Sequence, residues 1–386
     1  MPGPTRSLRL PLAATALATA LLAVVSLSGC STDAPSATAS SKPTMPAALT
    51  EAKALVAQHS AVPGFVSPGP ALDAAPAAGK TIMVISNNMQ AQQLVSVTEG
   101  VDQAAAAAGL KVLSRNADNQ VSEVRAGVQQ AVSQKVAAIV LVGATPSLNR
   151  QAIADAERAG IPVIAASVGL SETAAGIFGL SSADYELSGR LMAAGAIVRA
   201  KGAPVVAAAI TFTNPAVPDA MKGITKQLAT CGGACSITTT TNIEPVDWAT
   251  KIPSQASASA LANTRLNTIF TVPDDSMAML AASGLTSETT ASIAVVGAGG
   301  SGAAPLTALA KNGRFSVDPG SSALYTGWGA VDQVLRSILD LAPGDDVTPS
   351  RYLDAEALAD VDVSEPTEIY GDAYVAGFTA LWHLDG

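Results

Sequence analysis

The sequence predicts an α/β fold made of two lobes, each with its own parallel sheet. Between residues 80 and 167, short apolar runs rich in Val and Ile alternate with longer stretches of helical periodicity. Such runs are typical of strands buried on both faces of a parallel sheet. The same alternation returns in the second half of the chain. Because each crossover between parallel strands must lie on a face of the sheet, each half is expected to form a Rossmann-like layer.

The first half is expected to supply four strands and three helices. The runs predicted as strands are Thr81–Ser86, Leu110–Arg115, Ala137–Gly143 and Ile161–Ser167. The stretches predicted as helices are Gln92–Ala108, Ser122–Gln134 and Ser147–Ala159. Gly109 and Gly160 follow two of these helices, as expected because glycine readily adopts the left-handed conformation that ends a helix.

The second half repeats this pattern. The runs predicted as strands are Ile177–Ser181, Pro204–Thr211, Ser236–Thr241, Asn267–Val272 and Ser292–Gly297. The stretches predicted as helices are Tyr185–Ala200, Val217–Ala229, Trp248–Ala262 and Ser276–Ala282. This predicts a second α/β lobe of similar size.

The chain begins with a segment typical of export. Arg6 and Arg9 precede an apolar run, Leu10–Val25, which is too short and too rich in Ala for a stable membrane span. Leu27-Ser28-Gly29-Cys30 resembles a bacterial lipobox, whose cysteine is acylated and becomes the first mature residue. Residues 1–30 are therefore expected to be a lipoprotein signal. Acyl chains on Cys30 would tether the protein outside the cytoplasmic membrane.

Residues 31–79 are dominated by Ala, Ser, Thr and Pro. A stretch with so few large apolar side chains buries little surface, so a flexible linker is expected, with room for one short helix where Ala47–Gln58 shows an apolar period. The formal net charge of −9 disfavours nucleic acid as a partner.

The sequence offers no catalytic residues. Its two histidines, His59 and His383, lie in the linker and near the C-terminus, so neither completes a Ser-His or Cys-His arrangement. Gly-x-Ser-x-Gly is absent. His59 has no Cys, Asp or second His at ligand spacing, which disfavours a metal site. We expect a binding protein without cofactor or metal rather than an enzyme.

Polar residues follow the predicted strands, where α/β sheets bind their ligands. Two facing lobes would enclose a small polar ligand between these ends. The candidate ligand-binding residues are Asn87, Asn88, Gln90, Asp118, Asn119, Thr145, Ser167, Phe212, Asn214, Asp247, Trp248, Asp274, Ser301 and Trp328. Asp247 at a helix start is equally consistent with an N-cap, and Trp248 and Trp328 with core packing.

Cys231 and Cys235 lie between a predicted helix and strand, and are expected to form a local disulfide outside the membrane, where thiols oxidise. A rival interpretation comes from Gly297–Gly302, which fits the pattern G-x-G-x-x-G after a strand. Asp318 follows at about the place of a ribose-binding acid, so an NAD-binding oxidoreductase is an alternative. A lipid-anchored exterior, which offers little nicotinamide cofactor, argues against it.

The order of these units resembles the type I periplasmic binding proteins, particularly the sugar-binding lipoproteins of ABC importers. The similarity covers roughly residues 80–355. The segments that carry it are Lys80–Ser86, Ala159–Ile164, Thr271–Ala278, Val296–Gly297 and Ala310–Gly313. The run Thr271–Ala278 is similar to the Asn-Asp-x-Met-Ala segment of the sugar branch.

The resemblance implies a hinge in which the chain crosses between lobes three times. These crossings fall near Leu180–Ala183, Asp318–Ala323 and Ser350–Asp354. Lobe one then comprises residues 80–181 with 323–351, and lobe two residues 182–322 with 352–386. Within the last of these, Ser364–Gly386 carries apolar residues at four-residue steps, which predicts a helix docked on lobe two.

The resemblance also implies a function: a monomer captures a sugar-like solute and delivers it to an ABC permease. A lipoprotein that feeds a membrane sensor kinase is the alternative within the same fold. This chain departs from the sugar branch at two places. The loop after Ser292–Val296 lacks the usual aspartate, and Thr211–Ala220 lacks the usual arginine. The identity of the solute therefore stays open.

Overall fold

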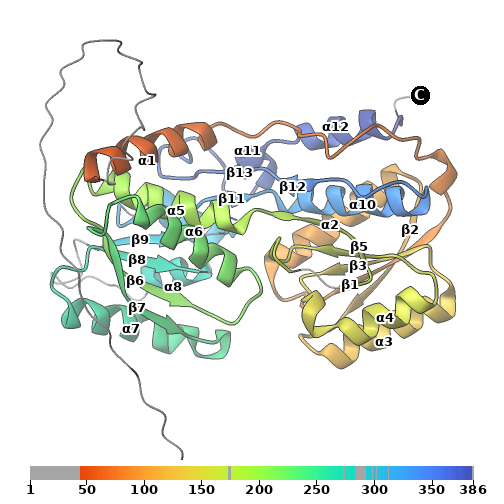
Figure 1. The fold of residues 1–386 in the computed structure, drawn as a ribbon, viewed down its shortest axis with the longest axis horizontal. Helices are drawn as coiled ribbons and strands as arrows, with labels where there is room; N and C mark the ends of the chain where they lie inside the picture. The colour runs from red at the N-terminus through yellow and green to blue at the C-terminus, as the bar shows by residue number, and fades with distance from the viewer. Residues whose placement is uncertain are drawn as a thin grey trace, which may run out of the picture. The chain divides into compact units, whose positions relative to one another are not determined.

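The computed structural model describes residues 44–384, apart from 173–174, 273, 283–292, 298, 301 and 312. The described residues belong to one compact unit, Lys42–Gly386. Their strands form a six-stranded sheet, a five-stranded sheet and a separate pair of short strands. The first two sheets are parallel throughout. The predicted α/β class with two parallel sheets is confirmed (Figure 1).

The first lobe is built on the six-stranded sheet, in the order β12-β5-β4-β3-β1-β2. Its strands are β1 Thr81–Ser86, β2 Lys111–Asn116, β3 Ala138–Val142, β4 Val163–Ala166, β5 Ile177–Ala183 and β12 Asp346–Thr348. Its helices are α2 Gln92–Ala107, α3 Val121–Gln134, α4 Arg150–Arg158 and α10 Ala323–Ile338, with a short 3-10 turn, η2, at Pro146–Leu148. The predicted strands and helices of the first half are thus present, with ends shifted by at most a few residues.

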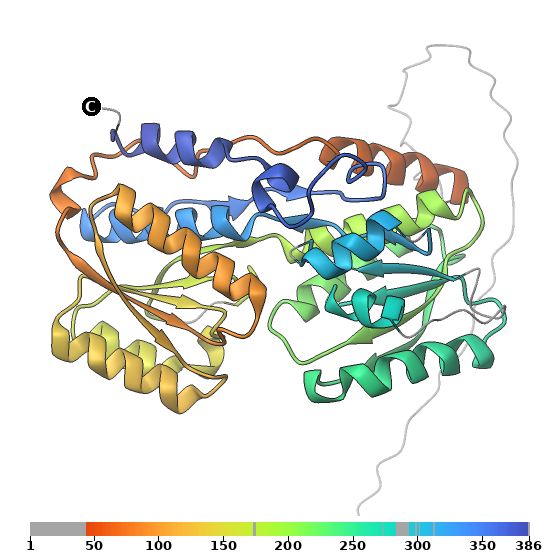
Figure 2. The same ribbon diagram turned by 180° about the vertical axis from the view of Figure 1, so that it is seen from behind.

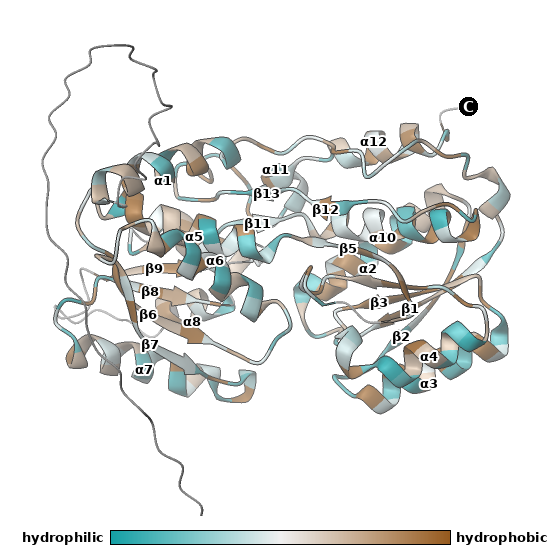
Figure 3. Ribbon diagram, in the orientation of Figure 1, coloured by the Kyte–Doolittle hydropathy of each residue, from teal (hydrophilic) through white to brown (hydrophobic). Residues whose placement is uncertain are grey.

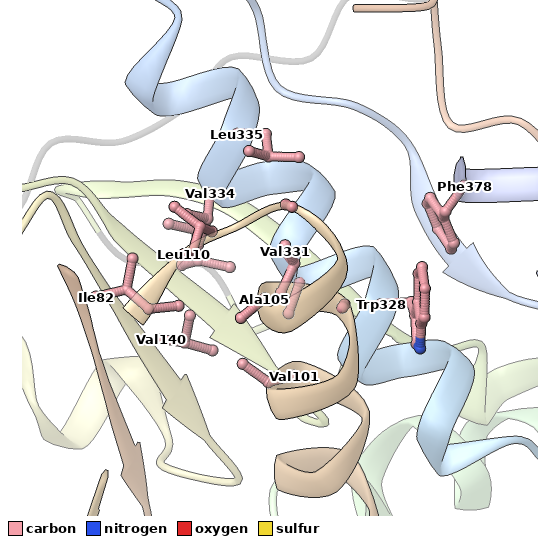
Figure 4. Packing of buried hydrophobic residues seen from close by; sticks show 14 of the residues in the cluster. Ile82, Val101, Ala105, Leu110, Val140, Trp328, Val331, Val334, Leu335 and Phe378 are labelled. Carbon is pink, nitrogen blue, oxygen red and sulfur yellow. The ribbon is translucent and has the colours of Figure 1, made fainter. Parts of the chain in front are cut away.

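The side chains of β1 point alternately to the two faces of this sheet, and different helices cover each face. Ile82 and Val84 pack with α2 and α10, whereas Met83 and Ile85 pack with α3 and α4. Successive side chains of a strand point to opposite faces, so a run that is apolar at every position buries both faces of the sheet. Figure 4 shows Ile82 meeting the α2 and α10 side of the core. In Figure 3 the strands are largely brown, while α3 and α4 carry teal residues.

The second lobe is built on the five-stranded sheet, in the order β10-β9-β8-β6-β7. Its strands are β6 Val206–Thr211, β7 Ser236–Asn242, β8 Thr268–Thr271, β9 Ala294–Gly297 and β10 Phe315–Val317. Its helices are α5 Tyr185–Arg199, α6 Val217–Ala229, α7 Trp248–Ala262, α8 Asp275–Ala282 and α9 Ala303–Lys311, with a 3-10 turn, η3, at Pro245–Asp247. Helices α5 and α6 cover one face, and α7, α8 and α9 cover the other.

Three crossings between the lobes lie where the resemblance implies them. The chain passes from β5 into α5, from β10 through β11 (Gly320–Ser321) into α10, and from β12 into β13 (Ser350–Arg351). Strands β11 and β13 pair antiparallel, so two of the crossings are held side by side. Beyond β13, Tyr352 and Leu353 are buried in the cores of the second lobe.

Residues 44–79 correct the expectation of a flexible linker over 31–79. Helix α1, Met45–His59, packs on α5 and buries Ala48, Ala52 and Leu55 in the core of the second lobe. The following segment reaches the first lobe, where Leu72, Ala74 and Ala77 are buried, the last in the 3-10 turn η1, Ala75–Ala77. Small side chains at four-residue steps allow close helix packing, so a stretch with few large apolar residues still joins the core. Residues 31–43 lie outside the described part of the chain.

The C-terminal segment corrects a second expectation. Helix α11, Pro366–Tyr370, packs in the second lobe as expected, but α12, Ala373–Leu381, packs in the first lobe. Tyr374, Phe378 and Trp382 meet Trp328 of α10, with the rings of Trp328 and Trp382 stacked 5.5 Å apart. The N-terminal segment runs beside α12, since Leu72 N donates to Leu381 O at 2.9 Å (Figure 2). The aromatic side chains of α12 therefore pack on the first lobe, where α10 provides an aromatic partner.

A buried ion pair fastens both terminal segments to α10. Arg336 Nε donates to Asp332 Oδ2 at 2.5 Å, with both side chains almost fully buried. Trp382 Nε1 donates to Asp332 Oδ1 at 2.8 Å, and Arg336 donates to the carbonyl of Pro70 at 3.1 Å. Each charge therefore has partners, which a buried ion pair requires.

A disulfide joins Cys231 and Cys235, whose α-carbons lie 5.7 Å apart, in agreement with the sequence expectation. It closes the turn between α6 and β7. Both cysteines are buried against the second-lobe core.

Candidate binding site at the strand ends

The carboxyl-terminal edges of the two sheets meet. Ser171, in the turn after β4 of the first lobe, donates to Asp219 in the first turn of α6, with Oγ to Oδ1 at 2.8 Å. A second contact joins the starts of two helices, where Gln93 Nε2 donates to the Tyr185 hydroxyl at 3.4 Å. The Ser171 turn follows the carboxyl end of β4, and the first turn of α6 follows that of β6. The polar residues at these strand ends therefore lie in one region of the molecule.

The first-lobe edge is a cluster of amide side chains. Asn87 Nδ2 donates to Asn119 Oδ1 at 2.9 Å, and Asn116 Nδ2 donates to Asp118 Oδ1 at 2.6 Å. Asp118 and Asn119 have positive φ angles of 47° and 60°. Asn and Asp tolerate this left-handed conformation because their short side chains hydrogen-bond locally. The turn after β2 thereby holds amide groups against the turn after β1.

The second-lobe edge combines a carboxylate with an aromatic pair. Glu244 accepts from Thr213 Oγ1 at 2.5 Å and from Asn242 Nδ2 at 2.7 Å. The hydrogen bond from Thr213 lowers the pKa of Glu244. Burial opposes this effect, and the hydrogen bond from Asn242 lowers the pKa further. Beside it, the rings of Phe212 and Trp248 meet edge to face at 5.4 Å. Trp248 Nε1 donates to the carbonyl of Ile243 at 2.7 Å, which fixes its ring.

Two buried carboxyl groups lie under the ends of β8 and β10. Asp274 is 4% exposed and Asp318 is fully buried. Burial raises the pKa of Asp318 well above its usual range, and the charge of Asp274 raises this pKa further. The backbone of Gly300 donates to Asp318 Oδ1 at 3.3 Å, and the Tyr370 hydroxyl donates to the carbonyl of Gly300 at 2.6 Å.

The same packing accounts for two glycines of the G-x-G-x-x-G run. A β-carbon on Gly299 would lie 2.5 Å from the Asp274 carboxylate, and Gly299 and Gly300 both have positive φ angles. Glycine is therefore required here to let the backbone pass Asp274 and Tyr370. A dinucleotide pyrophosphate is not needed to explain the motif.

Asp318→Asn mimics the neutral carboxyl and is expected to change how stability depends on pH. Because its folded-state pKa is raised, Asp318 gives its full stabilisation to the wild type below pH ~4, which is about the pKa of Asp in the unfolded chain. The wild type loses this stabilisation as the pH rises through the folded-state pKa. The variant lacks this loss, so its free energy of unfolding relative to wild type should increase from pH 4 to pH 8. Urea denaturation at several pH values measures this difference. A difference that stays constant across this range would contradict the assigned protonation.

Sequence comparison gives the family. Residues 82–337, more than half of the chain, match the family described as periplasmic binding protein domain. The chain belongs to this family. Among curated proteins, none matches it in sequence. The resemblance inferred from the sequence is confirmed.

Solved structures of periplasmic binding proteins share the fold. An ABC transporter solute-binding protein from Bacillus halodurans with bound myo-inositol has a TM-score of 0.65 at 15% identity, covering 75% of this chain and 99% of that one. One from Burkholderia graminis in complex with D-arabinose has a TM-score of 0.64 at 20% identity, covering 74% and 98%. One from Actinobacillus succinogenes with bound D-allose has a TM-score of 0.62 at 16% identity, covering 73% and 99%.

Some predicted site residues of this periplasmic binding protein lie at the meeting edges. Asn87, Asn119 and Asp118 belong to the amide cluster, and Phe212 and Trp248 form the aromatic pair. The residues Asn88, Gln90, Thr145, Ser167, Asn214 and Asp274 also follow strand ends. Two of these have local roles. Asn88 Oδ1 accepts from the amide of Gln90 at 2.9 Å, and Asn214 Oδ1 accepts from that of Ala216 at 2.8 Å.

Other predicted site residues have different surroundings. Trp328 is 4% exposed and packs among the rings of α12, which agrees with the alternative of core packing. Asp247 forms an ion pair with Lys251 at 2.7 Å, and its side chain makes no N-cap hydrogen bond. Ser301 and Cys30 lie outside the described residues.

Several edge residues were missed from the sequence. Asn116 and Asn242 are the last residues of β2 and β7 and directly follow the predicted strands, so a polar residue at the strand end was the available signal. Glu244 and Thr213 are brought together from different strands. Ser171 and Asp219 come from different lobes, and no local sequence pattern indicates such a pair.

Proposed function

We propose that the protein is an extracytoplasmic solute-binding lipoprotein. It captures a small neutral polyhydroxy solute between the two sheet edges and delivers it to an ABC permease. The observation that carries this proposal is the meeting of two polar edges through Ser171 and Asp219. Membership of the periplasmic binding protein family supports both the location and the binding role. Binding and lobe movement, without covalent chemistry, are sufficient for this function.

The chemistry of the edges favours a neutral ligand with many hydroxyl groups. Amide groups such as those of Asn87 and Asn119 can both donate to and accept from a hydroxyl. The Phe212 and Trp248 rings offer the kind of apolar surface that packs on the carbon face of a sugar. Glu244 and Asp118 add carboxylates that accept hydrogen bonds. Lys251, near the start of α7, is paired with Asp247. An anionic solute would be repelled here.

The ligands of the structural relatives support this class. Myo-inositol, D-arabinose and D-allose, bound in three of them, are all uncharged polyols or sugars. The low identities show only a shared fold, so the class of ligand rests on the residues of this chain.

The proposal includes attachment through Cys30. In the part of the chain that the structure describes, no helix is long and apolar enough to cross a membrane. Acylated Cys30 would supply the tether, and residues 31–43 would join it to α1. In cell fractionation, the wild type is expected in the membrane fraction and Cys30→Ser in the soluble fraction. Equal membrane association of both proteins would contradict lipid anchoring.

A thermal-shift panel tests the ligand class on the protein from residue 31 onward. The probes are myo-inositol, D-allose, D-arabinose and glycerol, with D-glucuronate and D-arabinose 5-phosphate as anionic counterparts. At least one neutral probe is expected to raise the melting temperature as its concentration rises. Binding only the folded form adds about 2.7 kcal/mol of stability at a hundred times the Kd. Shifts caused only by the anionic probes, or none across the panel, would contradict the proposal.

A further inference from the structure

The contact between Ser171 and Asp219 has the geometry of a latch. Ser171 Oγ lies 2.8 Å and 3.0 Å from the two carboxylate oxygens of Asp219, and its backbone amide lies 3.4 Å from Oδ2. The serine belongs to the turn after β4 and the aspartate to the first turn of α6. One carboxylate therefore receives a hydroxyl and a backbone amide from the opposite lobe.

Ser171 and Asp219 are each connected to one side of the first crossing between the lobes. On the first-lobe side, Ser182 Oγ of β5 donates to the carbonyl of Val168 at 2.6 Å, which ties the Ser171 turn to the strand that leads into the crossing. On the second-lobe side, Glu186 of α5 forms ion pairs with Lys222 at 2.7 Å and Lys226 at 2.8 Å. Helix α5 begins directly after the crossing, so α6 is tied to its other end.

The Glu186 connection persists over the physiological pH range. Hydrogen bonds from Lys222 and Lys226 lower the pKa of Glu186 to about 2. Movement at the crossing is therefore transmitted to the separation of Ser171 and Asp219, because each is tied to one side of it.

Gly169 shows how closely the lobes approach. A β-carbon on Gly169 would lie 2.7 Å from Asp219 Oδ2 and 2.9 Å from the carbonyl oxygen of Pro215, both in the second lobe. The third nearest atom, Asp219 Cγ at 3.6 Å, is in the second lobe too. Alanine at this position would thus act as a wedge between the lobes. The backbone does not adopt a positive φ angle here, so the substitution is compatible with the turn itself.

We propose that Ser171 and Asp219 form a latch that holds the lobes together and slows release of the solute without touching it. This inference rests on the proposed binding function. Asp219 directs its carboxylate at the Ser171 turn, so its contribution is to the stability of the closed arrangement. Affinity scales with the population of the binding-competent state, so a weaker latch lowers affinity through faster release. Loss of one such hydrogen bond at a partly exposed site is expected to speed release about threefold to tenfold.

The first measurement uses the protein without solute. Spin labels on Leu148→Cys and Val246→Cys, exposed positions at the edges of the two lobes, report the distance between lobes. The disulfide occupies Cys231 and Cys235, and the protein starts after Cys30, so only the new cysteines carry labels. Ser171→Ala, Asp219→Asn and Gly169→Ala are each expected to shift the distance distribution to longer values. Thr225→Ala is the matched control, since its hydroxyl bonds only within α6.

The second measurement is the release rate of the panel compound that binds the wild type, followed by stopped flow. The three latch variants are expected to release it faster with little change in association rate, and Thr225→Ala to behave as wild type. Unchanged label distances in Ser171→Ala and Asp219→Asn would overturn the latch, as would longer distances with unchanged release. Failure of every panel compound to bind contradicts the proposed function, whereas the label distances still test the latch.

Discussion

Trp382→Ala is expected to lower the free energy of unfolding by about 3–5 kcal/mol, the range for removing a large buried aromatic side chain. Trp382 is fully buried, stacks on Trp328 and donates a hydrogen bond to Asp332 at 2.8 Å. The substitution removes packing in the first-lobe core and one partner of a buried carboxylate. Trp382 lies beyond residues 82–337, which match the family, so the effect tests whether the terminal helix is part of this fold.

Two further variants separate the causes. Trp382→Phe keeps a ring in place but lacks the N–H donor, so a smaller loss than that of Trp382→Ala is expected. Leu341→Ala is the control for a large-to-small change, because Leu341 is 41% exposed and lies just after α10, the helix on which Trp382 packs. Urea denaturation of all four proteins measures these differences. If Trp382→Ala unfolds within 1 kcal/mol of the wild type, α12 does not belong to the first-lobe core.

The terminal segments also contact the hinge. Tyr352 N, just after β13, donates to the carbonyl of His59 at 2.7 Å, and Arg351 Nε donates to the carbonyl of Ser60 at 3.3 Å. Arg351 also donates to the carbonyl of Ile369 in α11. The end of α1 and the start of the C-terminal segment therefore lie on the third crossing strand.

Periodicity was enough to predict the two sheets. In β1, Ile82–Ile85 are apolar at every position and all are buried, so the strand is recognisable from the sequence without knowledge of its neighbours. Helices such as α3 carry an apolar face at helical spacing, with Val124, Val128 and Ala131 buried. These signals are local, which is why they are visible in one sequence.

Docking of the terminal segments could not be predicted in the same way. Ala48 and Ala52 are fully buried or nearly so, yet alanine is equally common in flexible linkers. For α12, the sequence shows an apolar stripe but not its partner. Phe65, Tyr325 and Trp328 select the first lobe, and they come from distant parts of the chain.

The site was predicted in position more successfully than in detail. The strand ends are fixed by the sheets, so Asn87, Asn119 and Phe212 lie at the edges as expected. What each side chain does there depends on partners from other strands. Thr213 and Asn242, which follow or end different strands, both donate to Glu244, and burial beside Asp274 raises the pKa of Asp318, which sequence alone does not reveal.

Removing one contact from each edge is expected to abolish tight binding. Asn87→Ala deletes an amide of the first-lobe edge, and Phe212→Ala deletes a ring of the second-lobe edge. Each is expected to weaken affinity about threefold to tenfold, in line with the loss of a hydrogen bond or an aromatic contact. Because the residues lie on different lobes, the effects should multiply to about tenfold to a hundredfold in the double variant. Asn263→Ala, at the other end of the second sheet, is the control.

Calorimetric titration of these four variants and the wild type, with the neutral polyol that gives the largest thermal shift, tests the central claim most directly. If the solute is held between the two sheet edges, both single variants bind about threefold to tenfold more weakly, the double variant loses the product of the two effects, and Asn263→Ala matches the wild type. Wild-type affinity in either Asn87→Ala or Phe212→Ala would contradict a site shared by the two edges.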